Sequence, residues 1–289
     1  MDLNGTKLVK EKNTMDLFRL DRASCVRCGA CVKDCAFGAL KRDDDGYPFV
    51  KDAARCMRCQ HCFAICPRGA IAFGAHTADE ALQRGRCALP TGEEVENFLM
   101  MRRSYRQFKE GDVPRETLEH LLKVLGNVPT GCNARSLTFT CIPTRRAMAA
   151  FKEKFVHIIE RHHDGPKLLP RWLAVPAIRL RQGKGDIFFR NAPALLIISS
   201  DETNKEVTTP REDVTNAATT FEFLAQSHHL ATCWCGFLQL VQKEVPELLE
   251  DLLGFRRTTP FCAMLLGLPA VSYPRGVLRA DDAKVVFVE

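Results

Sequence analysis

The sequence predicts an α+β protein of two domains, a small cysteine-rich domain followed by a larger one in which helices flank a central sheet. Three observations lead to this prediction. Eight of the 14 cysteines lie between Cys25 and Cys66, and the other six are scattered along the rest of the chain. After residue 92, apolar residues alternate between helical and strand spacing. The chain has 289 residues, 46% hydrophobic and 26% charged, which is typical of folded globular proteins and sufficient for more than one core.

The charge balance and the apolar runs exclude several classes of partner. The formal net charge is +6, from 41 Lys and Arg against 35 Asp and Glu. The sequence contains no block of basic residues of the kind that predicts nucleic-acid binding. The longest apolar runs, at 192–198 and 261–268, are too short to span a bilayer, and residues 1–12 are polar with mixed charge. We therefore expect a cytoplasmic protein without a membrane or nucleic-acid partner, whose reduced thiols bind metal rather than form disulfides.

The small domain is defined by a cysteine spacing that occurs twice. Each run has the spacing C-x2-C-x2-C-x3-C, the second run begins 31 residues after the first (56 minus 25), and Pro67 follows its last cysteine. Three closely spaced thiolates can bind three corners of an iron–sulfur cubane, while the fourth corner needs a thiolate from elsewhere. The spacing resembles that of bacterial ferredoxins with two [4Fe–4S] clusters, over residues 16–74. We expect one cluster on Cys25, Cys28, Cys31 and Cys66 and a second on Cys56, Cys59, Cys62 and Cys35.

The main alternative for these cysteines is a pair of structural zinc sites. Zinc sites favour two C-x2-C pairs separated by a longer gap, rather than two compressed runs of the same spacing. The chain departs from the ferredoxin pattern at Ala36, where no proline follows Cys35. The small residues Gly29, Ala30 and Ala36 are expected to let backbone N–H groups approach the cluster sulfurs. We therefore expect clusters rather than zinc, with short strands at 39–40 and 70–73.

A tail over residues 1–15 and a linker over residues 75–92 are expected to flank the small domain, and the large domain covers residues 93–289. Thr91 and Glu94 form a capping box for its first helix, whose buried stripe we expect to be Val95, Phe98 and Leu99. Further helices are expected between Pro114 and a stop at Gly126, over 147–162, and over 213–229. Strands are expected at 137–142, 194–198, 233–237, 261–266 and 285–288.

The inward face of the 213–229 helix is expected to include Phe221 and His228. The apolar 194–198 strand is of the kind that is buried on both faces. The histidine pairs at 162–163 and 228–229 lack metal-like partners and are expected on helix surfaces or ends. Cys233 and Cys235 are expected to be core residues, not a redox pair.

Four stretches of the large domain carry a resemblance to a known family. The domain has no G-x-G-x-x-G fingerprint and no Walker A sequence, which excludes the common Rossmann and P-loop nucleotide sites. The four stretches are 102–108, 129–136, 191–193 and 266–269, the last followed by Arg275 and Arg279. In this order and spacing they resemble the nitroreductase family of FMN-dependent oxidoreductases, over about residues 95–289. The whole chain resembles a ferredoxin–nitroreductase fusion protein.

The resemblance implies that Arg102, Ser104 and Arg106 contact the phosphate and ribityl chain of FMN, together with Arg279. Arg103 lies in the same stretch and is included in the candidate site. Arginine suits this role because its planar guanidinium binds phosphate with two parallel hydrogen bonds. If the stretch is helical, Arg102 and Arg106 are four residues apart and share a face, so both can converge on one anion.

The resemblance further implies a homodimer with two equivalent flavin sites. Pro129, Thr130 and Asn133 would come from the partner subunit and pack against the flavin ring, with Asn133 hydrogen-bonded to its edge. The backbone around Cys235 and Gly236 would donate a hydrogen bond towards flavin N5.

The 129–136 stretch departs from the family pattern at several positions. Thr130 stands where serine is usual, and Ala134, Arg135 and Ser136 stand where Gln-Pro-Trp is usual. Arg135 places an additional charge near the flavin or at the pocket rim. Residues 165–190 are expected to form a lid that sets substrate preference.

We therefore expect an FMN-dependent oxidoreductase with flavin-based chemistry and no catalytic side chain. Electrons would pass from two [4Fe–4S] clusters to FMN and then to a small organic acceptor, such as a nitroaromatic compound or a quinone. The donor would be a low-potential one, either ferredoxin-like or NAD(P)H. Alternatives are direct reduction of FMN by NAD(P)H with accessory clusters, a non-catalytic electron-transfer module of a larger redox complex, and a zinc-stabilised interaction protein.

Overall fold

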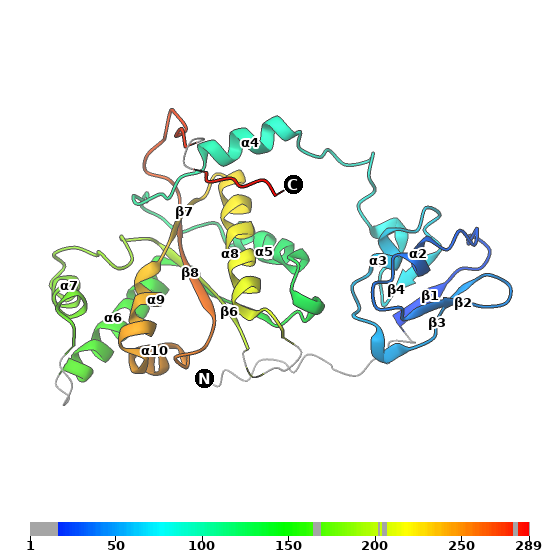
Figure 1. Cartoon of the computed structure of the whole chain (residues 1–289). Coiled ribbons are helices and arrows are strands. Elements are labelled where there is room, and N and C mark those ends of the chain that lie inside the picture. The colour runs from blue at the N-terminus through cyan, green and yellow to red at the C-terminus, as the bar shows by residue number, and fades with distance from the viewer. Residues whose placement is uncertain (1–16, 164–168, 202, 204–206, 280–282, 289) are drawn as a thin grey trace. The chain divides into compact units, whose positions relative to one another are not determined.

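A computed structural model describes residues 17–163, 169–201, 203, 207–279 and 283–288 (Figure 1). The chain divides into two compact units, Met1–Leu89 and Pro90–Glu289, which we describe separately. The tail expected over residues 1–15 lies outside the described residues. The division at residue 89 falls within the segment that the sequence analysis treats as a linker.

The first unit contains two small antiparallel sheets and two short helices. Strand β1 (Phe18–Leu20) pairs with β4 (Ile71–Phe73), and β2 (Leu40–Arg42) pairs with β3 (Pro48–Val50). Helices α2 (Ala30–Lys33) and α3 (His61–Ala64) each carry the third cysteine of a run. Single 3-10 turns lie at Ala53–Arg55 and Ala78–Glu80. The strands expected at 39–40 and 70–73 therefore form, each starting one residue later.

The sequence repeat of the first unit is also a backbone repeat. Three pairs of residues, each pair 31 positions apart, have positive φ angles: Arg27 and Arg58 (56° and 53°), Gly29 and Gln60 (74° and 62°), and Gly38 and Gly69 (63° and 61°). Positive φ is uncommon outside glycine, so three matched pairs show that both cysteine runs adopt the same loop. The unit has only a small apolar core, in which Cys31, Leu40 and Ile71 are buried.

The second unit is built on a four-stranded antiparallel sheet in the order β5-β6-β8-β7. The strands are β5 (Leu137–Ile142), β6 (Ala194–Ser200), β7 (Ala231–Trp234) and β8 (Phe261–Gly267). The central strands β6 and β8 are buried along their whole length. Both were expected from their apolar runs, and the expected strand 137–142 matches β5.

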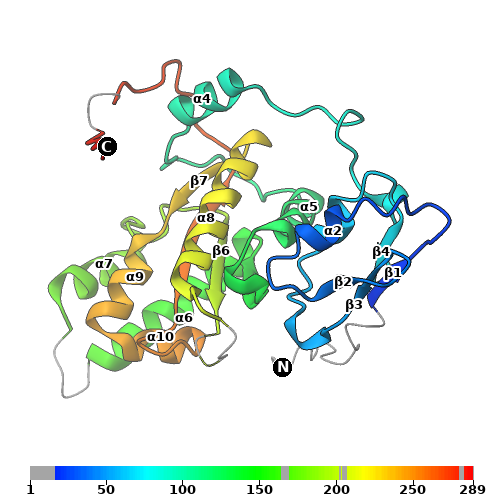
Figure 2. The ribbon, with the colours of Figure 1, turned by 45° about the vertical axis from the view of Figure 1, so that its right-hand side comes forward.

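Helices cover both faces of this sheet (Figures 1 and 2). On one face, Leu195 and Ile197 of β6 pack in a core with α6 (Arg145–His163), α7 (Arg171–Arg181), α9 (Gly236–Glu244) and α10 (Pro246–Leu253). On the other face, Leu196 and Ile198 pack in a second core with α5 (Arg115–Val124) and α8 (Pro210–Ser227). Side chains alternate across a strand, so two covered faces explain why β6 is apolar at five successive positions, 194–198. The predicted α+β class is confirmed.

Helix α4 (Gly92–Met101) begins where the capping box predicts, with Thr91 Oγ1 accepting from Glu94 N–H at 3.2 Å. Its expected buried stripe is wrong. Val95 and Leu99 are 44% and 49% exposed, and Phe98 is half-buried against Phe223. The pattern correctly shows an amphipathic helix, but the apolar face has little cover within the described part of this chain.

Four other expectations about this unit are corrected. Residues 102–106 are not helical, because α4 ends at Met101. The strand expected at 233–237 is β7, which ends at Trp234, and α9 then starts at Gly236. Residues 285–288 form no strand and are exposed, and His228 is exposed rather than inward.

Part of the segment expected to form a lid packs into the core. Within its described residues, 169–190, helix α7 buries Leu173 completely, and Phe188 and Phe189 join the same core. Lys152 forms an ion pair of 2.6 Å with buried Asp186, whose carboxylate also accepts from Phe189 N–H at 2.7 Å. These contacts fix the segment to α6 and to the sheet.

Candidate functional site

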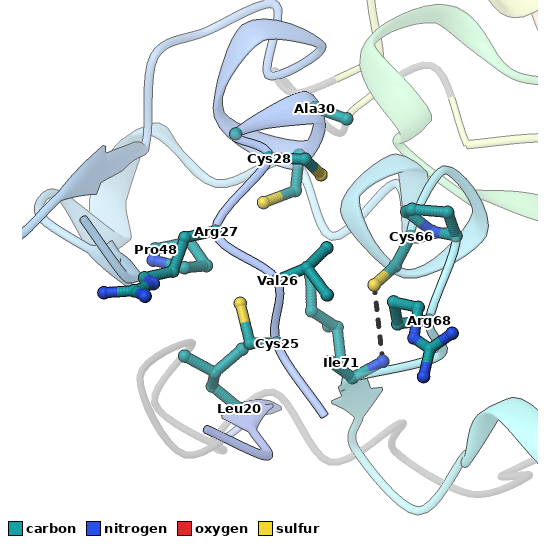
Figure 3. A pocket seen from close by; sticks show the side chains of 14 residues that line it. Leu20, Cys25, Val26, Arg27, Cys28, Ala30, Pro48, Cys66, Arg68 and Ile71 are labelled. Atoms are coloured by element: carbon teal, nitrogen blue, oxygen red, sulfur yellow. Dashed lines mark hydrogen bonds between the residues drawn. The ribbon is translucent and has the colours of Figure 1, made fainter. Parts of the chain in front are cut away.

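Cysteines from both runs line one cavity of the first unit. The cavity is partly open to solvent and has an empty volume of about 350 Å³, and its lining includes Cys25, Cys28, Cys31 and Cys66. Figure 3 shows the thiols of Cys25, Cys28 and Cys66 turned towards a common space. Cys66 follows α3 and lines the cavity together with three cysteines of the first run. The structure thus brings together the four residues expected to share the first cluster.

The other four cysteines also lie near one another. Burial raises the pKa of the Cys56 thiol, and the neighbouring thiols of Cys59 and Cys35 raise it further. Burial raises the pKa of the Cys62 thiol to about 12, and its neighbours include Cys56 and Cys59. Cys35 therefore approaches the second run, as crossed ligation requires.

The chemistry of these cysteines fits a cluster better than a zinc ion. All of them are free thiols. A structural zinc site takes four ligands at about 2.3 Å from one ion and favours two separated C-x2-C pairs, not two compressed runs of four cysteines. A cubane instead offers four iron corners to four separated thiolates. Since the raised pKa of half-buried Cys62 favours its protonated form, cluster binding has to displace that proton.

The backbone around the first cysteine set also suits an anionic group. Gly29 has φ +74°, and a Cβ there would collide with the guanidinium of Arg42, which donates to Cys28 O at 3.0 Å. Consecutive backbone N–H groups in such left-handed turns form concave anion sites. Ala70 N–H donates to Cys66 Sγ at 3.3 Å, the hydrogen bond dashed in Figure 3.

In the second unit, residues 102–106 are held by α8 and β7. Arg102 Nη1 lies 3.2 Å from Oε1 of buried Glu222. Gln226 Nε2 donates to Arg103 O at 2.8 Å, and Tyr105 N–H donates to Thr232 O at 2.8 Å. Ser104 lies between these anchored residues and is half-buried.

Arg106 lies close to Cys233, a thiol that Glu222, the partner of Arg102, also approaches. Burial raises the pKa of the Cys233 thiol, and the nearby guanidiniums of Arg190 and Arg106 partly offset this effect. Arg190 and Asn191 both have positive φ angles, 51° and 54°, in the loop that Asp186 caps. Arg190 was not among the residues that the sequence suggested for the site. Nothing in its neighbouring sequence indicates that its guanidinium lies near Cys233.

The 129–133 loop is held at the other end of α8. Gly131 N–H donates to Asp213 Oδ1 at 2.8 Å, and Asn216 Nδ2 donates to Pro129 O at 3.3 Å. Asn133 has φ +53°. Thr130 Oγ1 accepts from Arg135 N–H at 3.1 Å.

Arg135, the charged departure from the family pattern, contacts its own loop. Its Nη1 donates to Val128 O at 3.1 Å, and its φ is +54°. The guanidinium therefore stabilises the backbone conformation of the residue before Pro129.

The two segments expected to bind flavin contact different parts of α8 within one chain. Asp213 and Glu222 are nine positions apart on α8 (222 minus 213), which corresponds to about 14 Å at 1.5 Å per residue. The 129–133 loop contacts α8 at Asp213, and the 102–103 segment contacts it at Glu222. Within one chain, the contacts with α8 therefore hold the two segments apart.

Cys235 and Gly236 differ in what they can offer a ligand. Burial raises the pKa of the Cys235 thiol to about 12, and its N–H donates to Ala263 O at 2.8 Å. Gly236 is exposed and is the first residue of α9, so its N–H has no partner within that helix. Cys233 and Cys235 are buried in the core, as expected.

The C-terminal segment returns to the 102–106 region. The rings of Tyr105 and Tyr273 are 5.1 Å apart, and a Cβ on Gly276 would lie 3.0 Å from Met100 O. Arg279 is exposed three residues beyond Gly276.

Sequence reasoning missed the buried acids of α8. Asp213 and Glu222 are 4% and 5% exposed. Their spacing could have revealed them, because residues four apart share one face of a helix. Asp213 lies four residues before buried Ala217, and Glu222 lies four residues after buried Ala218.

The fold and these sites define a class of protein, an oxidoreductase that combines an iron–sulfur domain with a helix-flanked antiparallel α+β domain. Residues 24–71 match the model of the 4Fe-4S dicluster domain, and residues 99–268 match that of the nitroreductase family. The second match covers more than half of the chain, which therefore belongs to the nitroreductase family. The expected fusion and the expected enzyme class, an FMN-dependent oxidoreductase of this family, are confirmed.

One solved structure shows the fold of the second unit, and a further one is similar to it. A nitroreductase with bound FMN from Bacteroides fragilis has 19% identity and a TM-score of 0.51, covering 67% of this chain and 99% of that chain. A nitroreductase-like family protein from Bacillus cereus has 16% identity and a TM-score of 0.49, covering 69% and 99%. A search of curated proteins returned no match. No helix in the described ranges is long and apolar enough to cross a membrane.

Proposed function

We propose that this protein passes electrons from two [4Fe–4S] clusters to FMN and on to a small organic acceptor, such as a nitroaromatic compound or a quinone. The observation that carries the proposal is the joining, in one chain, of crossed cysteine sets to a nitroreductase domain. Bound FMN supplies the exchange between one-electron and two-electron chemistry, and the protein positions it. The donor is a low-potential one-electron carrier or NAD(P)H.

In this proposal the first cluster is bound by Cys25, Cys28, Cys31 and Cys66. The second is bound by Cys56, Cys59, Cys62 and Cys35. Support comes from the shared cavity of the first set and the approach of Cys35 to Cys56. Anaerobic protein should contain about eight iron and eight sulfide per chain, the content of two cubanes. About half of that content would leave only one cluster.

For FMN, we propose that Arg102, Arg103, Ser104, Arg106 and Arg279 surround the phosphate and ribityl chain. Gly236 N–H, at the start of α9, is the proposed donor towards flavin N5, next to Cys235. Its position at a helix N-terminus supports this role, since the first N–H groups of a helix lack internal acceptors.

We further propose a homodimer in which Pro129, Thr130 and Asn133 complete the partner's flavin site. Two observations support it. The 129–133 loop and residues 102–103 contact levels of α8 that are about 14 Å apart. The apolar side chains of Val95, Leu99 and Met100 are exposed on α4, and burying such a face stabilises a dimer.

Stopped-flow spectroscopy under anaerobic conditions tests the electron path. A low-potential one-electron donor should bleach the clusters before the flavin, and an acceptor should then restore the oxidised spectrum. Flavin reduction without prior cluster bleaching contradicts this order. NADH reduction of FMN at an unchanged rate in a variant lacking both clusters favours direct reduction by NAD(P)H instead.

A further inference from the structure

A buried carboxylate connects helix α8 to the expected phosphate-binding segment. Glu222 is 5% exposed and lies on the face of α8 that packs against the sheet. Its Oε1 lies 3.2 Å from Arg102 Nη1 and 3.5 Å from Thr232 Oγ1, and its Oε2 accepts from Trp234 Nε1 at 3.2 Å. A buried carboxylate is costly unless its oxygens are paired, and here both oxygens have donors.

The geometry at Arg102 leaves room for a ligand. A guanidinium has five N–H donors in a planar fork, and Glu222 contacts it through Nη1. The Arg102 side chain is 30% exposed, so part of the fork is accessible from solvent. Glu222 thus fixes one edge of the guanidinium without enclosing the rest.

One turn later on α8, Gln226 holds the next residue of the segment. Its Nε2 donates to Arg103 O at 2.8 Å and to Thr232 Oγ1 at 2.6 Å, and its Oε1 accepts from Arg103 N–H at 3.4 Å. Thr232 is also a neighbour of Glu222. Glu222, Gln226 and Thr232 therefore form one network that sets both the side chain of Arg102 and the backbone of Arg103.

We propose that Glu222 is a positioning residue for the phosphate of the flavin cofactor, acting through Arg102. The inference rests on the proposed FMN site. Arg102 is held by one edge, so its remaining donors keep the orientation needed to bind a phosphate with two hydrogen bonds. Holding the side chain before the ligand arrives lowers the entropy lost on binding. Glu222 itself does not touch the phosphate.

Glu222→Gln tests the proposal, because it removes the charge and leaves one oxygen for three donors. The apoprotein is titrated with FMN and with riboflavin, which lacks the phosphate, and flavin fluorescence is measured. The FMN Kd should rise by about tenfold, the lower end of the loss that follows when residues orienting metal ligands are removed. The riboflavin Kd should stay within about twofold, since riboflavin gives Arg102 no phosphate to bind. Glu212→Gln, an exposed position of the same helix, is the matched control and should change neither.

A double-mutant cycle provides the second readout. In an Arg102→Gln background, Glu222→Gln should no longer affect FMN binding, because the residue through which it acts is gone. Trp234→Phe removes another donor to Glu222 but leaves the Arg102 contact, so FMN binding should stay within about twofold.

Three outcomes overturn the inference: equal weakening for both flavins, an undiminished effect in the Arg102→Gln background, or tighter FMN binding in Glu222→Gln. If Glu222→Gln does not fold, Glu222→Asp keeps the charge and shortens the side chain, and the same comparison of flavins applies. A wild-type protein that binds neither flavin contradicts the proposed function itself, which is a different result from any of these.

Discussion

The two units of this protein build their sites in opposite ways. In the first unit, the proposed ligands lie within two short runs, and the loops of both runs have matching left-handed residues. Its apolar core is small, with Cys31 itself among the buried residues. In the second unit, two large cores cover both faces of a sheet, and segments distant in sequence are fixed to α8 by buried acids. We therefore expect the first unit to depend on its proposed clusters to fold, and the second on its own packing.

The largest expected effect is the loss of a cluster ligand. Cys66→Ser removes the only second-run cysteine of the first set, and we expect the first unit to unfold, since its core alone is too small to stabilise it. The second unit should stay folded. Limited proteolysis with mass spectrometry should show cleavage throughout residues 17–74 and a protected fragment near residues 90–289. Simultaneous digestion of both units would contradict the comparison, and Cys87→Ser is the control for loss of a thiol outside the two runs.

The matching test in the second unit is a cavity in its core. Phe221 is completely buried between α8 and the sheet, and Phe221→Ala should cost about 3–5 kcal/mol of its free energy of unfolding. Denaturant titration followed by fluorescence measures this cost. Iron content should not change, because the substitution lies in the other unit. Phe223→Ala, on the same helix but half-buried, should cost less.

The difference between the units also explains what the sequence could predict. The cysteine sets follow from spacing because three of four ligands are neighbours in the chain, and backbone geometry alone limits their arrangement. Strands β6 and β8 follow from their apolar runs because burial on both faces needs apolar residues at successive positions.

The predictions are wrong where contacts between residues distant in sequence determine the local structure. Arg102 was expected on a helix, but α4 ends before it, and the contact with Glu222 lies 120 positions away. Residues 285–288 have strand-forming side chains, yet a strand needs a pairing partner, and none lies beside them among the described residues. The apolar stripe of α4 correctly predicts an amphipathic helix, but the spacing of its residues does not indicate which part of the protein covers that face.

The exposed face of α4 provides a smaller test, on assembly rather than folding. Leu99→Asp places a charge on a side chain that is 49% exposed in one chain and that we propose to be buried in the dimer. The dimer dissociation constant should rise by at least about tenfold, and sedimentation velocity measures it. Glu96→Gln, an exposed position on the same helix, should leave it unchanged. Bound FMN should fall together with dimerisation, because the proposed site needs the partner's 129–133 loop, and full FMN content in a monomer would exclude that arrangement.

The smallest expected effect comes from substitutions at equivalent positions in the two halves of the first unit. Gly29 and Gln60 both have left-handed φ angles, +74° and +62°, but only one of them is glycine. A residue with a Cβ pays about 1 kcal/mol in this conformation, so Gly29→Ala should destabilise the unit and Gln60→Gly should stabilise it by a similar amount. Gly29→Ala should have the larger effect, because its Cβ also displaces Arg42 from Cys28 O. The measurement is the denaturant midpoint for loss of cluster absorbance under anaerobic conditions. Shifts of the same sign for both substitutions would show that the matched backbone angles do not control the stability of the two cluster loops.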